Sequence, residues 1–189
     1  LLLPVSFALE IDLLYDANGN LLDDKEHVYE YNSLNQLVRV REYTSAGRIL
    51  EEYAYDHTGE RILKVAYDRT GRETITYYPG EDFVTVHNDS GDFNTIFHRI
   101  DNQLLAEEKP SGEIQFFHPD HLGSTNLITD ALKNVVGYTD YTPFGEILRG
   151  GDTRFLFTGQ EHDDTGLNYY GARYYSPQLR RFTQPDSII

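Results

Sequence analysis

The sequence predicts an all-β fold, a long antiparallel meander in which the chain reverses at regular intervals. Tyr31, Tyr43, Tyr55 and Tyr67 are spaced 12 residues apart, and each is followed four residues later by Gly or Asn. Between these positions apolar and polar residues alternate, as they do in a half-buried strand. The chain also contains 15 Tyr and 10 Phe, residues that suit pleated, half-covered surfaces. These observations together indicate strands joined by tight turns.

Each repeat supplies a residue that tolerates a positive φ angle at the turn. Gly adopts positive φ without steric cost, and Asn is the next most tolerant type. Between the turns, one face of the segment from Arg61 to Tyr67 carries Leu63, Val65 and Tyr67, and the other carries Ile62, Lys64 and Ala66. The predicted turn residues are Gly19, Asn35, Gly47, Gly59 and Gly71.

Composition excludes several classes of function. The formal net charge of -15 argues against nucleic-acid binding, because phosphate neutralisation needs a basic surface. The absence of Cys excludes disulfides and Cys-based metal or nucleophile sites. We expect no cofactor and no metal site.

The first residues are apolar and interrupted by Pro4, too short a run to cross a membrane. Ser6 and Ala8 have the spacing of a signal-peptidase site. Leu1 to Leu9 is therefore either an apolar strand or a signal remnant, and both readings stay open. We divide the chain into an N-terminal segment (1–14), the repeats (15–76) and a C-terminal region (77–189), in which Leu104 to Lys109 has a helix-like composition.

His118, Asp120, His121 and Ser124 lie in one short block, and these residue types occur in zinc sites and hydrolase triads. Triad members normally come from separate parts of a fold, and metal ligands must project to one point. In a strand His118 and Asp120 share a face, whereas His121 points away. We therefore interpret the block as a structural turn with hydrogen-bonded His and Asp, and keep the hydrolase as a minor alternative.

The C-terminal stretch from Phe155 to Asp186 reads FLFTGQEHDDTGLNYYGARYYSPQLRRFTQPD. If its tyrosines lay on one strand, Tyr169, Arg173 and Tyr175 would line one face, and Tyr170 and Tyr174 the other. The stretch closely resembles the core signature of the Rhs/YD-repeat family, a GLYYYGARYYDP-type run followed by GRF and a PDP-type end. The blocks DHLGS and YTPFGE, and the Tyr-Asp pairs of the repeats, resemble the same family.

The resemblance implies an antiparallel β-meander that spirals into a shell and is closed by an Rhs-type core region. In some members the core precedes a toxin domain and cleaves the chain after itself in an aspartyl-protease-like manner. Arg173 and Asp186 stand where the family's self-cleavage Arg and first Asp stand, and the second Asp would fall downstream of Ile189. Two departures are Arg180 in place of a Gly and Lys133 in a turn position that favours positive φ. We expect the hairpin at Lys133 to be either remodelled or covered.

These observations lead to two hypotheses about function. The first is a non-enzymatic structural role as a shell segment of a secreted or surface-exposed Rhs/YD-repeat protein of the toxin-carrier type. The second is a self-assembling extracellular oligomer or filament, in which Leu1 to Tyr15 pairs with the sheet edge of another copy. The expected partners are further parts of its own chain, further copies and a C-terminal toxin domain, with no nucleic acid and no membrane span.

Overall fold

A computed structural model describes residues 12–101 and 103–186 of the 189-residue chain. Its strands form a 14-stranded sheet, in which every strand pairs with its neighbours in sequence, and a separate four-stranded sheet. Consecutive strands run antiparallel along both sheets, which confirms the predicted all-β meander. No helix in the described part of the chain has the length and apolar character needed to span a bilayer.

The first seven strands of the large sheet contain the Tyr repeats, and the next seven continue it without a break. The first seven are β1 (Leu14–Tyr15), β2 (Leu21–Asp23), β3 (His27–Tyr31), β4 (Leu37–Glu42), β5 (Ile49–Tyr55), β6 (Arg61–Tyr67) and β7 (Glu73–Gly80). The next seven are β8 (Phe83–Asn88), β9 (Gly91–Ile100), β10 (Gln103–Glu108), β11 (Ile114–Pro119), β12 (Thr125–Asp130), β13 (Val135–Tyr141) and β14 (Ile147–Gly150).

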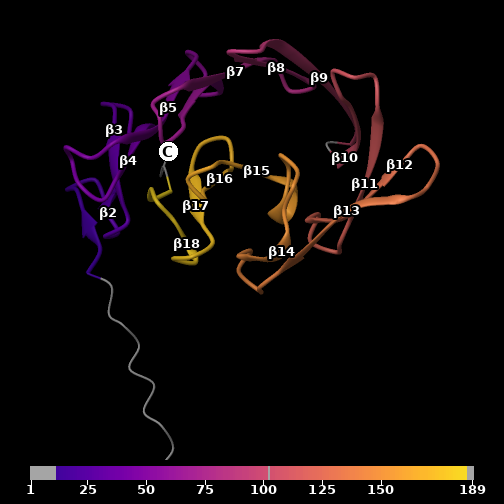
Figure 1. Ribbon diagram of the computed structural model, residues 1–189. Helices are drawn as coiled ribbons and strands as arrows, with labels where there is room; N and C mark the ends of the chain where they lie inside the picture. The colour runs from indigo at the N-terminus through magenta and orange to yellow at the C-terminus, as the bar shows by residue number, and fades with distance from the viewer. Residues whose placement is uncertain (1–11, 102, 187–189) are drawn as a thin grey trace, which may run out of the picture.

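The small sheet follows a single 3₁₀ turn, η1 (Phe157–Gly159), and its strands are β15 (Glu161–His162), β16 (Asn168–Tyr169), β17 (Tyr174–Ser176) and β18 (Arg181–Phe182). The large sheet bends into an arc, and the small sheet lies within its concave side (Figure 1). Segments from the two ends of the chain therefore lie side by side.

The predicted turn chemistry is confirmed at four of the five repeats. Gly19, Asn35, Gly59 and Gly71 have φ angles of 86°, 58°, 93° and 83°. The prediction is wrong at Gly47, where Tyr43 takes the positive φ of 58° instead. The chain there forms a longer loop in which the N–H of Glu42 donates to the carbonyl of Arg48.

Two further sequence expectations are corrected. Leu104 to Lys109 is not helical, because Gln103–Glu108 forms β10 between β9 and β11, and sheet pairing overrides the local preference. The turn at Lys133 is not remodelled. Lys133 itself adopts φ 67°, and the Asp130 carboxylate accepts hydrogen bonds from the backbone N–H groups of Leu132 and Asn134, both at 2.8 Å.

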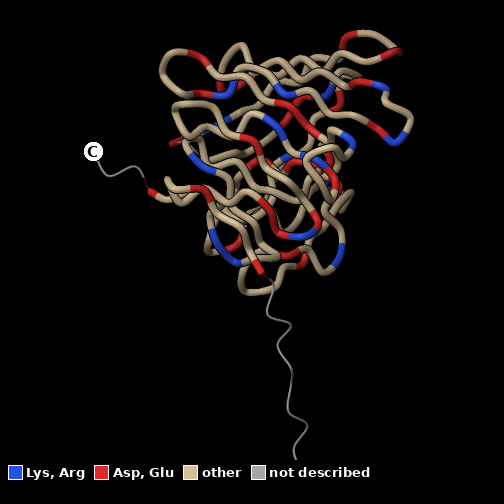
Figure 2. Tube along the Cα trace, turned by 90° about the vertical axis from the view of Figure 1, so that its left-hand side faces the viewer, with Lys and Arg blue, Asp and Glu red and all other residues tan. Residues whose placement is uncertain are grey.

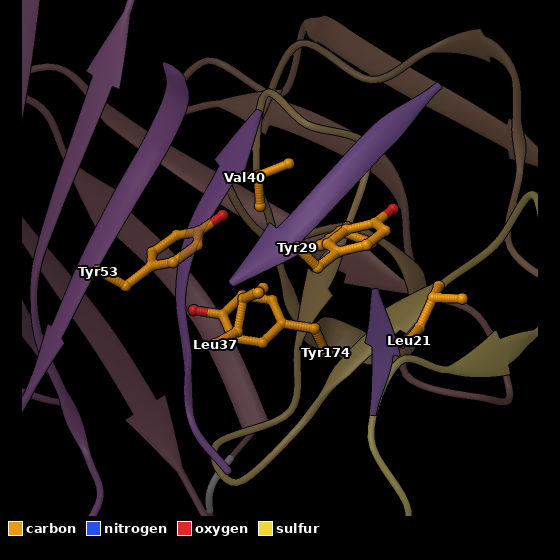
Figure 3. Close-up of a cluster of buried hydrophobic side chains, with 7 residues drawn as sticks. Leu21, Tyr29, Leu37, Val40, Tyr53 and Tyr174 are labelled. Carbon is orange, nitrogen blue, oxygen red and sulfur yellow. The ribbon is translucent and has the colours of Figure 1, made fainter. Parts of the chain in front are cut away.

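The main core lies between the first strands of the large sheet and the small sheet. Leu21, Leu37 and Val40 are fully buried there together with Tyr29, Tyr53, Leu167 and Tyr174, and Figure 3 shows Tyr174 between side chains of the large sheet. A second core packs Phe155 against Phe97, with ring centroids 5.0 Å apart. Apolar burial of this kind stabilises the contact between the two sheets.

Many of the charged side chains lie on the partly exposed surfaces of the strands and not in the two cores. Figure 2 shows Lys and Arg interspersed with Asp and Glu over the trace. Arg39, on β4, bridges Glu30 and Glu52 of the neighbouring strands at 2.7 and 2.5 Å. Such partly exposed pairs contribute little to stability, about 0–1 kcal/mol each. The buried charges between the sheets have a different environment.

Candidate functional site

The tyrosines of the C-terminal stretch lie on a hairpin, so the single-strand prediction for them is wrong. Gly171 adopts φ 76°, and Tyr169 pairs directly with Tyr174 across β16 and β17. The ring centroids of Tyr169 and Tyr174 are 5.1 Å apart, and those of Tyr170 and Tyr175 are 5.9 Å apart. The hairpin therefore places one Tyr pair toward the large sheet and the other on the opposite face.

Tyr174 anchors the small sheet to the large one. Its side chain is 1% exposed, and its ring centroid lies 5.0 Å from that of Tyr53 on β5. Its hydroxyl group lies 3.1 Å from the hydroxyl of Tyr55. Burying an aromatic ring with its hydroxyl satisfied combines a large apolar contribution with a defined orientation.

Backbone hydrogen bonds also join the two sheets. The N–H of Leu21, on β2, donates to the carbonyl of Thr183 at 2.8 Å, and the N–H of Thr183 donates to the carbonyl of Tyr174 at 2.8 Å. The Tyr31 hydroxyl donates to the same Thr183 carbonyl at 3.4 Å. The end of the small sheet is therefore tied directly to the first strands of the large sheet.

A buried ionic cluster forms the centre of the interface between the sheets. Arg61, at the start of β6, extends Nη1 to Asp163 Oδ2 at 2.6 Å and Nη2 to Glu161 Oε2 at 2.8 Å. Its Cζ atom lies 4.3 Å from the ring centroid of Tyr169. Two carboxylates therefore balance the charge of the guanidinium group, and an aromatic ring lies against it.

Two further cations complete the ionic cluster. Lys64 Nζ lies 2.6 Å from Asp163 Oδ1, and Arg154 Nη1 lies 2.6 Å from Glu161 Oε1. Burial by itself raises the pKa of Glu161, but the positive charges of Arg61, Lys64 and Arg154 outweigh it and lower this pKa to about 2. Glu161 is therefore ionised at neutral pH, as a carboxylate with three cationic neighbours should be.

Glu51, on β5, is the third buried acid of this interface. Its Oε1 atom accepts a hydrogen bond from the N–H of Asp164 at 3.1 Å, and its Oε2 atom accepts one from Thr165 Oγ1 at 3.0 Å. The Tyr53 hydroxyl also donates to this carboxylate. Glu51 thus binds the β15–β16 turn of the small sheet through the turn's backbone and hydroxyl groups.

The sequence did not predict this ionic cluster. Alternation correctly placed Lys64 and Leu63 on opposite faces of the strand. It did not show that a second sheet covers the face that carries Lys64. The sequence held two signals of the cluster: a charged residue, Lys64, within an otherwise apolar face of a strand, and the acidic run from Glu161 to Asp164. Matching them required the fold, because 99 residues separate Lys64 from Asp163.

The block around Ser124 proves to be a docking turn. Asp120 Oδ1 accepts the N–H groups of Leu122 and Ser124 at 2.8 and 2.9 Å. The buried Ser124 Oγ accepts the N–H of Thr158 at 3.0 Å, which holds η1 against the large sheet.

His118 lies apart from this arrangement. It is exposed, and its Nε2 atom lies 2.9 Å from Thr129 Oγ1. In the described residues no hydrogen bond joins His118 to Ser124, the contact that a hydrolase triad uses. Residues 12–101 and 103–186 also contain no group of three or more His, Asp or Glu side chains arranged to hold a metal ion.

Arg173 and Asp186, the two predicted self-cleavage residues, lie near each other. Arg173 Nη2 is 3.5 Å from Asp186 Oδ2, and the Asp186 side chain is 78% exposed. Arg173 Cζ lies 4.0 Å from the ring centroid of Phe182, so the guanidinium group stacks on an aromatic ring of β18. In the described part of the chain, no other acid pairs with Arg173.

The chain has relatives among known proteins. The family model described as Teneurin YD-shell matches residues 5–189. Salivary gland surface protein 1 of Aedes aegypti is 43% identical over 76 residues, covering 36% of this chain and 2% of that protein. Toxin subunit YenC1 of Yersinia entomophaga is 29% identical over 87 residues, covering 42% of this chain and 9% of that protein. The chain thus spans a small part of these relatives.

Solved structures show the same fold. The crystal structure of TcdB2-TccC3 has a TM-score of 0.79 at 21% identity and covers 92% of this chain and 10% of that chain. A structure of the Photorhabdus luminescens Tc holotoxin pore gives the same TM-score and identity, covering 93% and 10%. The matching family model and the shared fold confirm the resemblance seen in the repeats and the core signature, and the chain belongs to the Teneurin YD-shell family.

Proposed function

We propose that this chain is a non-enzymatic structural segment of a toxin-carrier type shell, in which the small sheet braces the concave wall and closes the shell. The observation that carries the proposal is the interface itself. Arg61, Lys64 and Tyr53 of the large sheet meet Asp163 and Tyr174 of the small sheet. Extensive burial of this kind fixes a shape and keeps the charged groups away from solvent.

The related toxin subunit and the Tc holotoxin structure support this role. We further propose that the chain is extracellular and that it associates with a toxin domain.

Negative-stain microscopy and light scattering of the native protein test the proposal. We expect discrete hollow particles. Long polymers built from repeated copies would contradict it and favour the filament hypothesis, in which β1 and β14, the outermost strands of the large sheet, pair between copies. Of the proposed donor segment, Leu1 to Tyr15, residues 1–11 lie outside the described residues.

We also propose that Arg173 and Asp186 form half of a self-cleavage site. Their 3.5 Å contact supports this role. In an acid pair of this kind, one carboxylate takes a proton from the attacking water while the other protonates the carbonyl oxygen, and the C–N bond then breaks as the amine takes a proton and leaves. The chemistry therefore needs a second carboxylate, which the family resemblance places on an Asp downstream of Ile189.

Mass spectrometry of the native protein tests this second proposal. We expect a cleaved product that disappears in Asp186→Asn and persists in Asp152→Asn, a control outside the site. Cleavage that continues in Asp186→Asn would overturn it.

A further inference from the structure

Glu51 differs from the other buried acids between the two sheets because, among the described residues, no cation pairs with it. Glu161 and Asp163 share the positive charges of Arg61 and Lys64. Glu51 is 0% exposed, and in the part of the chain that the structure describes it forms hydrogen bonds but no ion pair. A buried carboxylate without a cationic partner is costly to ionise.

The surroundings of Glu51 come from three elements. Tyr53 faces it from its own strand, Lys64 from β6, and Asp163, Asp164 and Thr165 from the β15–β16 turn. A groove beside Glu51 has a volume of about 370 Å³. The charged residues that line this groove with Glu51 are Arg48, Asp68, Arg69 and Asp164.

We propose that Glu51 makes the attachment of the β15–β16 turn to the large sheet depend on pH near neutrality, with the neutral side chain favouring attachment and the ionised side chain weakening it. The inference rests on the proposed bracing role of the small sheet. Ionised Glu51 places a further negative charge beside Asp163 where water is excluded. A neutral carboxyl still accepts the Asp164 N–H and can donate its own proton to the Tyr53 oxygen.

The direction follows from linkage between protonation and attachment. Burial, aided by the negative charge of Asp163, raises the pKa of Glu51 to about 7 from a usual value of 4.5. A group whose pKa is raised on attachment stabilises the attached state fully below its usual pKa, and this stabilisation is lost as the pH rises to the raised value. The attachment constant should therefore fall about twentyfold between about pH 5.5 and about pH 7.5.

Hydrogen exchange of the β15–β16 turn tests the proposal. The readout is protection of the Asp164 amide, which donates to Glu51, after correction for the pH dependence of intrinsic exchange. In the wild-type chain we expect protection to fall about twentyfold over this pH range. Glu51→Gln should remove the fall, and Glu52→Gln, on the other face of the same strand, should retain it. An unchanged fall in Glu51→Gln, or no fall in the wild type, would overturn the proposal.

A second measurement does not depend on the variant folding. Carbon-13 NMR of the wild-type side-chain carboxyl groups should show Glu51 titrating with a midpoint near the raised pKa of about 7. A midpoint near its usual 4.5 would overturn the proposal.

Failure of the bracing role itself would look different. The Asp164 amide would then exchange without protection at every pH. Strong protection that does not vary with pH would leave the brace intact and reject only the role of Glu51.

Discussion

Arg61 Nη1 and Asp163 Oδ2 lie 2.6 Å apart, although 102 residues separate the two in the chain. The contact joins the large sheet to the small one, and both side chains are almost completely buried. It accounts for the alignment of the small sheet on the concave side, because a buried ion pair tolerates little displacement. Since water is excluded from the pair, dissolved salt should screen it little.

Breaking the buried pair should be costly. Arg61→Met leaves Asp163 with Lys64 alone, and we expect the free energy of unfolding to fall by about 3–5 kcal/mol. Arg39→Met removes a partly exposed cation that bridges two glutamates of the neighbouring strands, and it should cost about 0–1 kcal/mol. Urea unfolding followed by circular dichroism measures both, and equal losses would contradict the assignment.

Tyr174 should be a major contributor to stability through its ring. We expect Tyr174→Ala to lower the free energy of unfolding by about 3–5 kcal/mol, because it leaves a large cavity between the sheets. Tyr138→Ala removes a Tyr that is 50% exposed and should change stability by about 0.5 kcal/mol or less. Thermal unfolding compares the two, and a tolerated Tyr174→Ala would show that the small sheet does not depend on this anchor.

The turn positions predict opposite effects of two matched substitutions. Lys133 has φ 67°, a conformation that costs a residue with a Cβ atom about 1–2 kcal/mol. Lys133→Gly removes this strain. It also gives the unfolded chain more conformational freedom, which costs about 0.5–1 kcal/mol. The net effect should be a rise of a few degrees in the melting temperature. Gly71→Ala should lower it through its φ of 83° alone, because nothing lies within 4 Å of the added Cβ. Changes of the same sign would contradict this interpretation.

Asp24 should make the fold sensitive to acid. Burial by itself raises its pKa, but hydrogen bonds from His27, Tyr29 and backbone N–H groups lower it to about 2. A lowered pKa stabilises the fold above the usual value of 3.8, and this stabilisation of about 2 kcal/mol is lost as the pH falls through the lowered value. Unfolding of the wild type and Asp24→Asn between about pH 5 and about pH 2 should show converging stabilities, and a constant difference would refute it.

The sequence predicted the large sheet well because its signals are local. The turn at Gly59 can be predicted from the residue type alone, because Gly tolerates positive φ. The two faces of β6 can be assigned from the alternation of adjacent residues. Arg180 and Lys133 keep the left-handed turn geometry of a Gly, with φ angles of 58° and 67°. Neighbouring strands impose that geometry, so the residue type alone was misleading there.

The contacts of the small sheet could not be predicted in the same way. The pairing of Glu51 with the Asp164 amide depends on two segments 113 residues apart. Tyr169 and Tyr174 share a face because the chain turns at Gly171. The β-forming residues on both sides of Gly171 made the stretch look like one continuous strand. Long-range docking of this kind leaves only weak traces in a single sequence.

A double-mutant cycle between Arg61 and Asp163 tests the central claim most directly. The free energy of unfolding is measured for the wild type, Arg61→Met, Asp163→Leu and the double variant. If the two sheets are joined by this pair, the double variant should be more stable than the sum of the single losses predicts, with a coupling of about 2–3 kcal/mol. A coupling below about 0.5 kcal/mol, the level found for distant and independent sites, would contradict the account.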